Sequence, residues 1–316
     1  MKVVSLFRLG ELEDELVEKF PQVDFKFIKK AKNIPFEDRQ SLDILIGYDG
    51  ELDESFLKDC PNLKWIAWYA TGVNSLPLDY LKNHNIKLTN SRGVQAKQLS
   101  EFILAFILDD YKKMRTLFIN QQNKVYDSKM VGRRLSGDKV LFLGTGAIAS
   151  RAAKLAKAFD MQVIGLSNSG KDKEWFDEVY KIEKLNEVIG EVDIIINALP
   201  ETNETIHLLQ YDHFKQMSND ALFINVGRGT IVKETTILKV LKENLIRHAY
   251  LDVFENEPLD ENNPLYELDN VTITAHITGN DNNINKEVTD IFVNNLKHFL
   301  NNKDLIENIV DLNKGY

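Results

Sequence analysis

The sequence predicts an α/β fold with two parallel sheets, because short apolar strands alternate with helical patterns along nearly the whole chain. The first series of strands begins with "KVVSLF" and ends with "IKLTN". A second series begins with "KVLFLGTG" and ends with "VTITAHI". The strands of this second series are continuous apolar runs, which is typical of strands covered on both faces. The chain of 316 residues is long enough for two domains of ordinary size.

Long helices separate and follow these two series. The periodicity predicts a helix from Gln98 to Asn120 and a final amphipathic helix over residues 286–301. Because the final helix comes after the second series is complete, we expect it to pack on the first domain. The predicted domains are therefore residues 1–95 with 284–316, and residues 96–283. The chain would cross between them twice and leave a cleft.

Composition and charge limit the classes of protein and partner. Hydrophobic residues make up 43% and charged residues 28%, a mixture typical of soluble globular proteins. The net charge of −9 argues against nucleic acid and anionic membranes as partners. The single cysteine, Cys60, excludes an intramolecular disulfide and a thiolate metal site, and it favours a reducing compartment. The apolar runs "MKVVSLF" and "FILAFIL" are too short for a secretion signal or a membrane span. We expect a cytoplasmic protein without a metal.

A glycine-rich turn joins a strand to a helix in "FLGTGAIASRAAKLA". Gly144, Gly146 and Ala149 form the pattern GxGxxA, in which the first glycine permits a tight turn and the second lets a pyrophosphate approach. The small Ala149 permits close packing of the helix on the strand. The amides of Ala147 and Ile148 would face the anion at the positive end of the helix. This setting predicts a Rossmann-type dinucleotide-binding turn; the alternative is a turn kept for packing alone.

The end of the next strand bears on the choice of cofactor. A carboxylate at this place normally holds the ribose 2′-hydroxyl of NAD, but here the strand ends at Ser167 in "VIGLSNSGKDK". Nothing at this position repels a 2′-phosphate, and Ser167, Asn168, Ser169 and Lys171 could bind one. We therefore favour NADP. The absence of an arginine and the presence of Asp172 leave NAD open.

Three polar residues follow late strands of the second series. They are Arg228 in "FINVGRGTIV", Glu257 in "LDVFENEPL" and His276 in "ITAHITG". Each alone has an ordinary interpretation: a solvated turn, a loop charge or a structural histidine. Ligands of open parallel sheets bind outside the carboxyl ends of the strands, so the three together indicate one site at that edge.

The order and spacing of these motifs resemble the D-isomer-specific 2-hydroxyacid dehydrogenases, over nearly the whole chain. The shared marks are the glycine turn, "NVGRG", a D-x-x-E-x-E-P run and a late strand that ends in histidine. The resemblance implies a Rossmann dinucleotide-binding domain and a smaller flavodoxin-like α/β substrate domain. It also implies NAD(P)-dependent reduction of a small 2-keto acid, such as glyoxylate, hydroxypyruvate or pyruvate, as in glyoxylate/hydroxypyruvate reductase-like and phosphoglycerate dehydrogenase-like members.

The same resemblance implies a division of roles among the three residues, and the chemistry agrees with it. The guanidinium of Arg228 offers a rigid fork of donors for the substrate carboxylate and would also polarise the ketone oxygen. His276 would donate a proton to the developing alkoxide and take it back in oxidation. Glu257 would bind the imidazole, fix its tautomer and favour its protonated form. The neighbouring glycines would let substrate and cofactor approach the backbone.

Supporting roles follow from the resemblance as well. Asp252 would accept a hydrogen bond from the nicotinamide carboxamide; the alternative is a cap at the end of its strand. The backbone amides of Thr71 and Gly72 in "YATGVNSLP" would meet the substrate carboxylate. Further residues implied to line the cofactor are Leu199, Pro200, Thr205, Val226 and Gly227.

Two further expectations concern partners. The family resemblance implies a homodimer, and the apolar helix from Gln98 with the following "LFINQQNKVY" is our candidate interface. The competing function is an NAD(P)-sensing binding protein, like the transcriptional corepressors that share this fold and can keep the same three residues. We expect such a protein to carry disordered, protein-recruiting extensions, which this sequence does not show.

Overall fold

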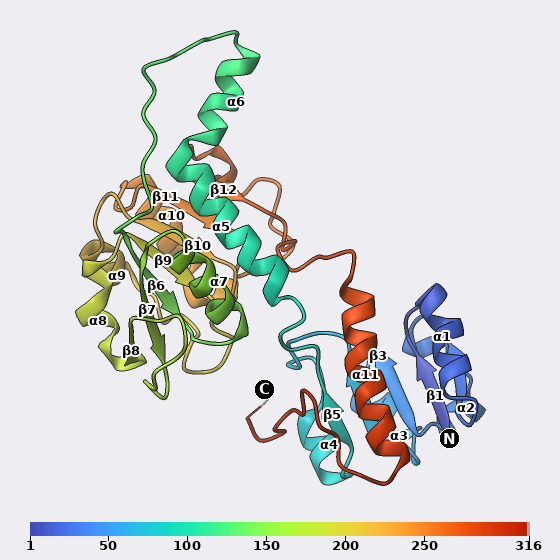
Figure 1. Ribbon diagram of the computed structural model, residues 1–316. Coiled ribbons are helices and arrows are strands. Elements are labelled where there is room, and N and C mark those ends of the chain that lie inside the picture. The colour runs from blue at the N-terminus through green and yellow to red at the C-terminus, as the bar shows by residue number, and fades with distance from the viewer. Residues whose placement is uncertain (315–316) are drawn as a thin grey trace. The chain divides into compact units, whose positions relative to one another are not determined.

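The computed structural model describes residues 1–314, and the chain divides into two compact units (Figure 1). Unit 1 comprises Met1–Val94 and the segment that begins at Asp281, and unit 2 comprises Gln95–Asn280. Each unit is built around its own parallel sheet with helices on both faces, so the predicted α/β class is confirmed.

Unit 2 contains a seven-stranded sheet whose order is β12-β11-β10-β9-β6-β7-β8. All neighbouring strands pair in parallel. The strand order reverses between β6 and β9, which creates the kind of crevice in which doubly wound sheets bind ligands. The strands are β6 Lys139–Leu143, β7 Gln162–Ser167, β8 Glu178–Lys181, β9 Ile194–Asn197, β10 Leu222–Asn225, β11 His248–Leu251 and β12 Val271–Ile273.

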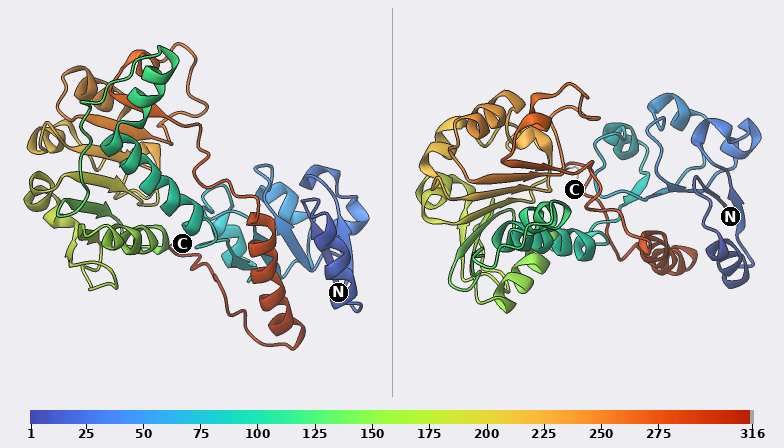
Figure 2. Two further views of the ribbon diagram at one scale, coloured as in Figure 1. Left: turned by 45° about the horizontal axis from the view of Figure 1, so that its top comes forward. Right: turned by 90° about the horizontal axis from the view of Figure 1, so that it is seen from above.

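Helices cover both faces of this sheet (Figure 2). Successive residues of a strand point to opposite faces, so Val140 and Phe142 pack with α5 and α7. Leu141 and Leu143 pack with the other three helices. The helices are α5 Ala96–Lys112, α7 Ala147–Ala158, α8 Leu185–Val188, α9 Tyr211–Gln216 and α10 Glu234–Lys242.

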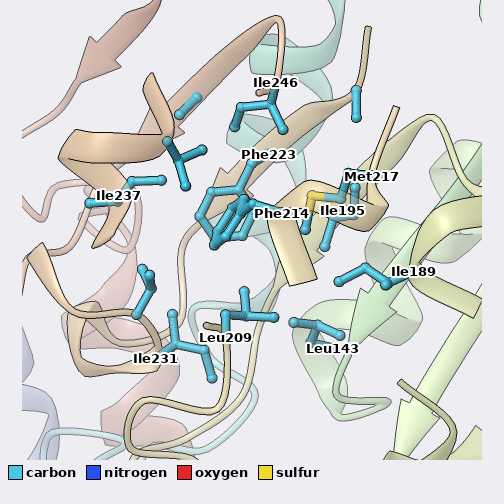
Figure 3. Packing of buried hydrophobic residues seen from close by; sticks show 14 of the residues in the cluster. Leu143, Ile189, Ile195, Leu209, Phe214, Met217, Phe223, Ile231, Ile237 and Ile246 are labelled. Carbon is cyan, nitrogen blue, oxygen red and sulfur yellow. The ribbon is translucent and has the colours of Figure 1, made fainter. Parts of the chain in front are cut away.

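A pair of aromatic rings lies at the centre of the second of these layers (Figure 3). Phe214 of α9 and Phe223 of β10 meet edge to face, with ring centroids 5.5 Å apart and an interplanar angle of 89°. Both side chains are fully buried. Ile195, Leu209 and neighbouring apolar side chains close around them, so this layer has a continuous core.

Unit 1 contains a five-stranded parallel sheet in the order β2-β1-β3-β4-β5. The final helix, α11, packs on one face of this sheet beside α1, where Phe292 stacks on Trp65 at 5.3 Å. The opposite face is covered by α3 and α4. The elements are β1 Lys2–Ser5, α1 Glu11–Lys19, β2 Asp24–Phe27, α2 Phe36–Gln40, β3 Ile44–Gly47, α3 Glu54–Lys58, β4 Trp65–Trp68, α4 Leu78–Asn83, β5 Lys87–Thr89 and α11 Ile284–Leu300.

The predicted long helix over residues 98–120 is wrong in one respect, because it is two helices. α5 ends at Lys112; the next residue, Lys113, has a left-handed φ of 55°, and α6 then runs over Met114–Gln122. α6 has no buried residue, so no core packing holds it in line with α5. In Figure 1, α6 and the following extended segment project from unit 2. Across the described part of the chain, no helix combines the length and apolar character that crossing a membrane requires.

The core pair of unit 2 yields a stability prediction. Replacing Phe223 by alanine leaves a cavity around Phe214 and should lower the free energy of unfolding by about 3–5 kcal/mol. Phe36, which is 61% exposed, is the matched control, and its replacement by alanine should change stability by less than about 0.5 kcal/mol. Chemical denaturation followed by circular dichroism measures both. Equal effects of the two substitutions would contradict the core assignment.

Candidate active site

The two glycines of the turn after β6 have different surroundings. Gly144 has a φ of 98°, and a Cβ there would lie 3.3 Å from the Ala198 carbonyl oxygen. Gly146 is the N-cap of α7, and a Cβ added to it would meet no atom within 4 Å. Gly144 is therefore required by the fold, whereas Gly146 leaves open space at the positive end of α7. Ala147 is exposed there and Ile148 is half-buried, while Ala149 is fully buried against the sheet.

The turn after β7 has no carboxylate at the position where an NAD ribose would be held. Ser167 is half-buried at the strand end, and its Oγ accepts a hydrogen bond from the Gly170 amide at 3.1 Å. Asn168 Nδ2 donates to Glu204 Oε2 at 3.4 Å. Asn168, Ser169 and Lys171 are exposed around the turn.

A buried amide pair fixes the turns that follow β9 and β10. Asn197 Nδ2 donates to Asn225 Oδ1 at 2.8 Å, and both side chains are closed to solvent. Asn197 Oδ1 accepts from the Leu199 amide at 3.2 Å, while Asn225 Nδ2 donates to the Arg228 carbonyl at 3.2 Å. One pair of side chains thus sets the start of both loops. Val226, which is buried, donates from its amide to the Asn197 carbonyl at 3.2 Å.

The loop after β9 is held together by Thr205. Its Oγ1 donates to the Pro200 carbonyl at 2.7 Å and accepts from the Thr202 amide at 2.8 Å. The exposed Pro200 and the half-buried Thr205 therefore lie on one compact turn. The predicted contacts of Leu199, Pro200 and Thr205 with a cofactor stay predictions.

The glycines beside Arg228 are required by the protein itself. A Cβ on Gly227 would lie 2.8 Å from the Leu199 carbonyl oxygen, and one on Gly229 would lie 1.9 Å from the Phe254 carbonyl carbon. That these glycines let ligands approach the backbone stays a prediction; the structure shows that Asn197, Leu199 and Phe254 occupy the positions that their side chains would take. Arg228 is half-buried between them, and its Nη1 donates to the Gly227 carbonyl at 2.8 Å.

Glu257 and His276 form a direct pair. Glu257 Oε2 lies 2.7 Å from His276 Nδ1, and Glu257 Oε1 accepts from the Phe254 amide at 2.9 Å. An ionised carboxylate only accepts, so Nδ1 carries its hydrogen and Nε2 remains for a ligand. About half of the His276 side chain is exposed, at 52%. Phe254 connects this pair to the Arg228 turn, because its backbone contacts Gly229.

Asp252 at the end of β11 holds the segment that carries His276. Its carboxylate accepts from Thr274 Oγ1 and Thr278 Oγ1, both at 2.6 Å. It also accepts from the Ile277 amide at 3.0 Å and the Thr278 amide at 3.2 Å. Asp252 is 1% exposed, so these four donors satisfy a buried charge. This arrangement fits the strand-end cap that we considered as the alternative; a contact with nicotinamide stays a prediction.

A second histidine–glutamate pair, which the sequence analysis did not single out, lies in the same group of loops. His207 Nε2 is 2.8 Å from Glu255 Oε1, and Glu255 Oε2 accepts from the Glu234 amide at 2.9 Å. The Glu234 amide and the His207 ring hold the pKa of Glu255 below its usual range. The His207 amide donates to the Thr230 carbonyl at 2.7 Å, so the pair joins the loop after β9 to the Arg228 turn.

The structure brings the three predicted catalytic residues to one edge of unit 2. Arg228 follows β10, Glu257 follows β11 and His276 follows β12, and these strands are neighbours in the sheet. Thr71 and Gly72 lie in unit 1, in the loop after β4. Their carbonyls accept hydrogen bonds from Asn90 Nδ2 and Trp68 Nε1, both at 2.9 Å.

Comparisons with known proteins identify relatives of this chain. A family model described as "D-isomer specific 2-hydroxyacid dehydrogenase, NAD binding domain" matches residues 104–278. A glyoxylate reductase from Aeropyrum pernix is 32% identical over 240 residues, which cover 71% of this chain and 70% of that protein. A probable 2-ketogluconate reductase from Dictyostelium discoideum is 28% identical and covers 92% of this chain and 90% of its own. The structure of an Aeromonas salmonicida D-isomer specific 2-hydroxyacid dehydrogenase family protein superposes with a TM-score of 0.88, at 28% identity, over 98% of this chain and 99% of its own.

The fold and the site together define a dinucleotide-dependent oxidoreductase that acts on 2-hydroxy acids with NAD(P). The chain belongs to the D-isomer specific 2-hydroxyacid dehydrogenase family, which confirms the resemblance seen in its motifs.

The contrast between two glycines yields a prediction. Gly229→Ala forces a Cβ into the Phe254 backbone and should destabilise unit 2 by more than about 3 kcal/mol or prevent its folding. Gly146→Ala meets open space and should leave the thermal unfolding temperature of the ligand-free protein nearly unchanged. Thermal melts of the two variants test this, and a Gly229→Ala protein as stable as the wild type would show that the described turn is incorrect.

Proposed function

We propose that the protein reduces a small 2-keto acid of the glyoxylate, hydroxypyruvate or pyruvate type to the D-2-hydroxy acid, with NADPH preferred over NADH. The observation that carries this proposal is the Glu257–His276 pair, at 2.7 Å, beside the Arg228 turn. The glyoxylate reductases among the relatives support a substrate of this size.

The chain's own residues supply binding and proton transfer. The guanidinium of Arg228 binds the substrate carboxylate and polarises the adjacent ketone oxygen. A bound nicotinamide cofactor supplies the hydride that reaches the ketone carbon. His276 then gives the proton on Nε2 to the developing alkoxide, while Glu257 stabilises the positive charge of the imidazole. In the oxidation direction, neutral His276 accepts that proton through Nε2.

The residues around the glycine turn fit a dinucleotide. The open space at Gly146 and the N-terminus of α7 would hold the pyrophosphate. The turn at Ser167 lacks the acidic side chain that binds the 2′-hydroxyl of NAD, and this absence supports NADP. Binding of NADPH and NADH to the wild-type protein compares the two cofactors directly.

Replacing Arg228 tests its proposed role in binding the substrate carboxylate. Arg228→Ala should lower kcat/KM for 2-keto acids by at least about 100-fold, because a bidentate contact to a carboxylate is lost in the transition state. Arg228→Lys keeps the charge but not the fork, and it should recover only part of the activity. The measurement follows NADPH and NADH oxidation with glyoxylate, hydroxypyruvate and pyruvate. Unaltered rates in Arg228→Ala, or no turnover with any 2-keto acid, would contradict the proposal.

The competing function, a corepressor-like sensor of NAD(P), has a different signature. Such a protein would bind the cofactor and a protein partner with negligible turnover. Because such proteins can keep the same three residues, the Glu257–His276 pair does not discriminate between the two functions; the glyoxylate reductases and the probable 2-ketogluconate reductase among the relatives favour the enzyme.

We also propose a homodimer that forms through the projecting arm, residues 112–134, which includes α6. Apolar side chains are exposed along this arm, among them Leu117 at 43%, Phe118 at 60% and Ile119 at 51%. A second copy of the chain is the occupant that the charges favour: the arm carries seven lysines and arginines and one aspartate, whereas the whole chain has a net charge of −9. α5, the other candidate, buries Ile103, Phe106 and Ile107 within unit 2.

The molecular mass in solution tests whether the arm forms a dimer interface. The wild-type protein should scatter light as a particle of twice the 36.3 kDa chain mass at micromolar concentration. A Phe118→Asp, Ile119→Asp double variant should be monomeric, because charged side chains would face an apolar interface. Phe159→Asp, at another partly exposed site, is the control and should leave the dimer intact. A monomeric wild type would rule the proposal out.

We also propose a cytoplasmic location, because a sequence with a single cysteine suits a reducing compartment. The single cysteine, Cys60, is buried, and burial raises the pKa of its thiol to about 12. Cell fractionation tests this location, and recovery outside the cytoplasmic fraction would contradict it.

A further inference from the structure

We propose that Lys181, the last residue of β8, helps to select NADP by binding its 2′-phosphate together with the turn that follows β7. This inference rests on the proposed function and assigns the cofactor preference to a residue outside the segment 167–171.

The pairing of β7 with β8 places Lys181 beside that turn. In the parallel register, Ser167 lies opposite Lys181. Gly170, whose φ is 60°, packs directly on the end of β8, since a Cβ there would lie 2.7 Å from Lys181 Cγ and 3.1 Å from the Lys181 amide nitrogen. The aliphatic stem of Lys181 therefore supports the turn, while the residue as a whole is exposed.

The turn presents hydroxyl donors. Ser167 Oγ accepts from the Gly170 amide at 3.1 Å, and Ser169 Oγ accepts from the Lys171 amide at 3.4 Å. A serine hydroxyl has a single O–H, and accepting a hydrogen bond does not use it. Both O–H groups consequently remain able to donate. A phosphate oxygen needs such donors, whereas a ribose hydroxyl held by NAD-specific sites needs a carboxylate acceptor.

Lys171 and Lys181, like Lys173 between them, have no carboxylate partner among the described residues. Among residues 1–314, neither the Lys171 nor the Lys181 ammonium has an ion pair within 4 Å. Nearby, Lys157 pairs with Asp177 at 2.8 Å and Lys184 pairs with Glu187 at 2.7 Å. Two uncommitted cations beside two hydroxyl donors form a set that suits a phosphomonoester, which carries a charge of about −1.5 to −2 at pH 7.

Two carboxylates oppose this arrangement: Asp172, which is exposed and follows Lys171 in the sequence, and Glu204. Glu204 Oε2 lies 3.4 Å from Asn168 Nδ2, so it places a negative charge next to the turn. The ammonium groups of Lys171 and Lys181 offset these negative charges. Neutralising Lys181 should therefore weaken binding of the 2′-phosphate, and neutralising Glu204 should strengthen it.

The experiment compares dissociation constants for NADPH and NADH, measured by fluorescence at fixed ionic strength. Lys181→Gln should weaken NADPH about tenfold and leave NADH within about twofold, because one charged contact to the phosphate is lost. Lys181→Arg should retain most of the NADPH affinity. Lys184→Gln is the matched control, since that lysine is already paired, and it should change neither constant. Glu204→Gln should tighten NADPH selectively.

The outcomes separate this inference from the proposed function. If Lys181→Gln weakens both cofactors equally or neither, or if the wild type prefers NADH, Lys181 is not a selectivity residue, although the enzyme can still be a 2-keto acid reductase. If the wild type binds neither cofactor, the proposed function and this inference fail together.

Discussion

The arrangement of the candidate active site depends on one buried carboxylate. Asp252 lies at the end of β11, is closed to solvent, and accepts four hydrogen bonds from the segment between Thr274 and Thr278. A buried charge that lost these donors would be strongly unfavourable, so the segment has little freedom to adopt another course. His276 lies inside this segment with a left-handed φ of 53°, and its amide donates to the Asp252 carbonyl at 2.9 Å. That constraint fixes the backbone of His276, and the hydrogen bond with Glu257 then orients its imidazole.

Close backbone packing extends this constraint to the other two catalytic candidates. Phe254 follows Asp252 by two residues; its amide holds Glu257 at 2.9 Å, and its carbonyl occupies the space that a side chain on Gly229 would need. The Arg228 turn is thereby fixed against the same segment that orients the histidine. A parallel sheet favours this clustering of the three residues, because it places the carboxyl ends of β10, β11 and β12 next to one another. Three short turns can then place a guanidinium, a carboxylate and an imidazole on one edge.

The sheets and the glycine turn could be predicted from the sequence, whereas several features that depend on tertiary packing could not. Continuous apolar strands and the GxGxxA turn are local signals, so the parallel sheets and the turn at Gly144 were predictable. The break at Lys113 was not, because it depends on the absence of a core beneath α6. β8 is short, and none of its residues is buried, so its pattern does not stand out from a loop. The sequence also could not show that Leu199 and Phe254 fill the positions of side chains on Gly227 and Gly229, because that packing joins residues far apart in the chain. The buried Asn197–Asn225 pair had one sequence signal, an asparagine at the end of each apolar strand.

We propose that Arg228 binds the carboxylate of a 2-keto acid while His276, oriented by Glu257, faces its ketone oxygen. The most direct measurement is a crystal structure with NADPH and oxamate, an unreactive analogue of pyruvate. We expect the oxamate carboxylate to lie on the Arg228 guanidinium and its amide oxygen to lie within hydrogen-bond distance of His276 Nε2. Oxamate bound away from Arg228, or an imidazole that turns from Glu257 when the ligand is present, would contradict it.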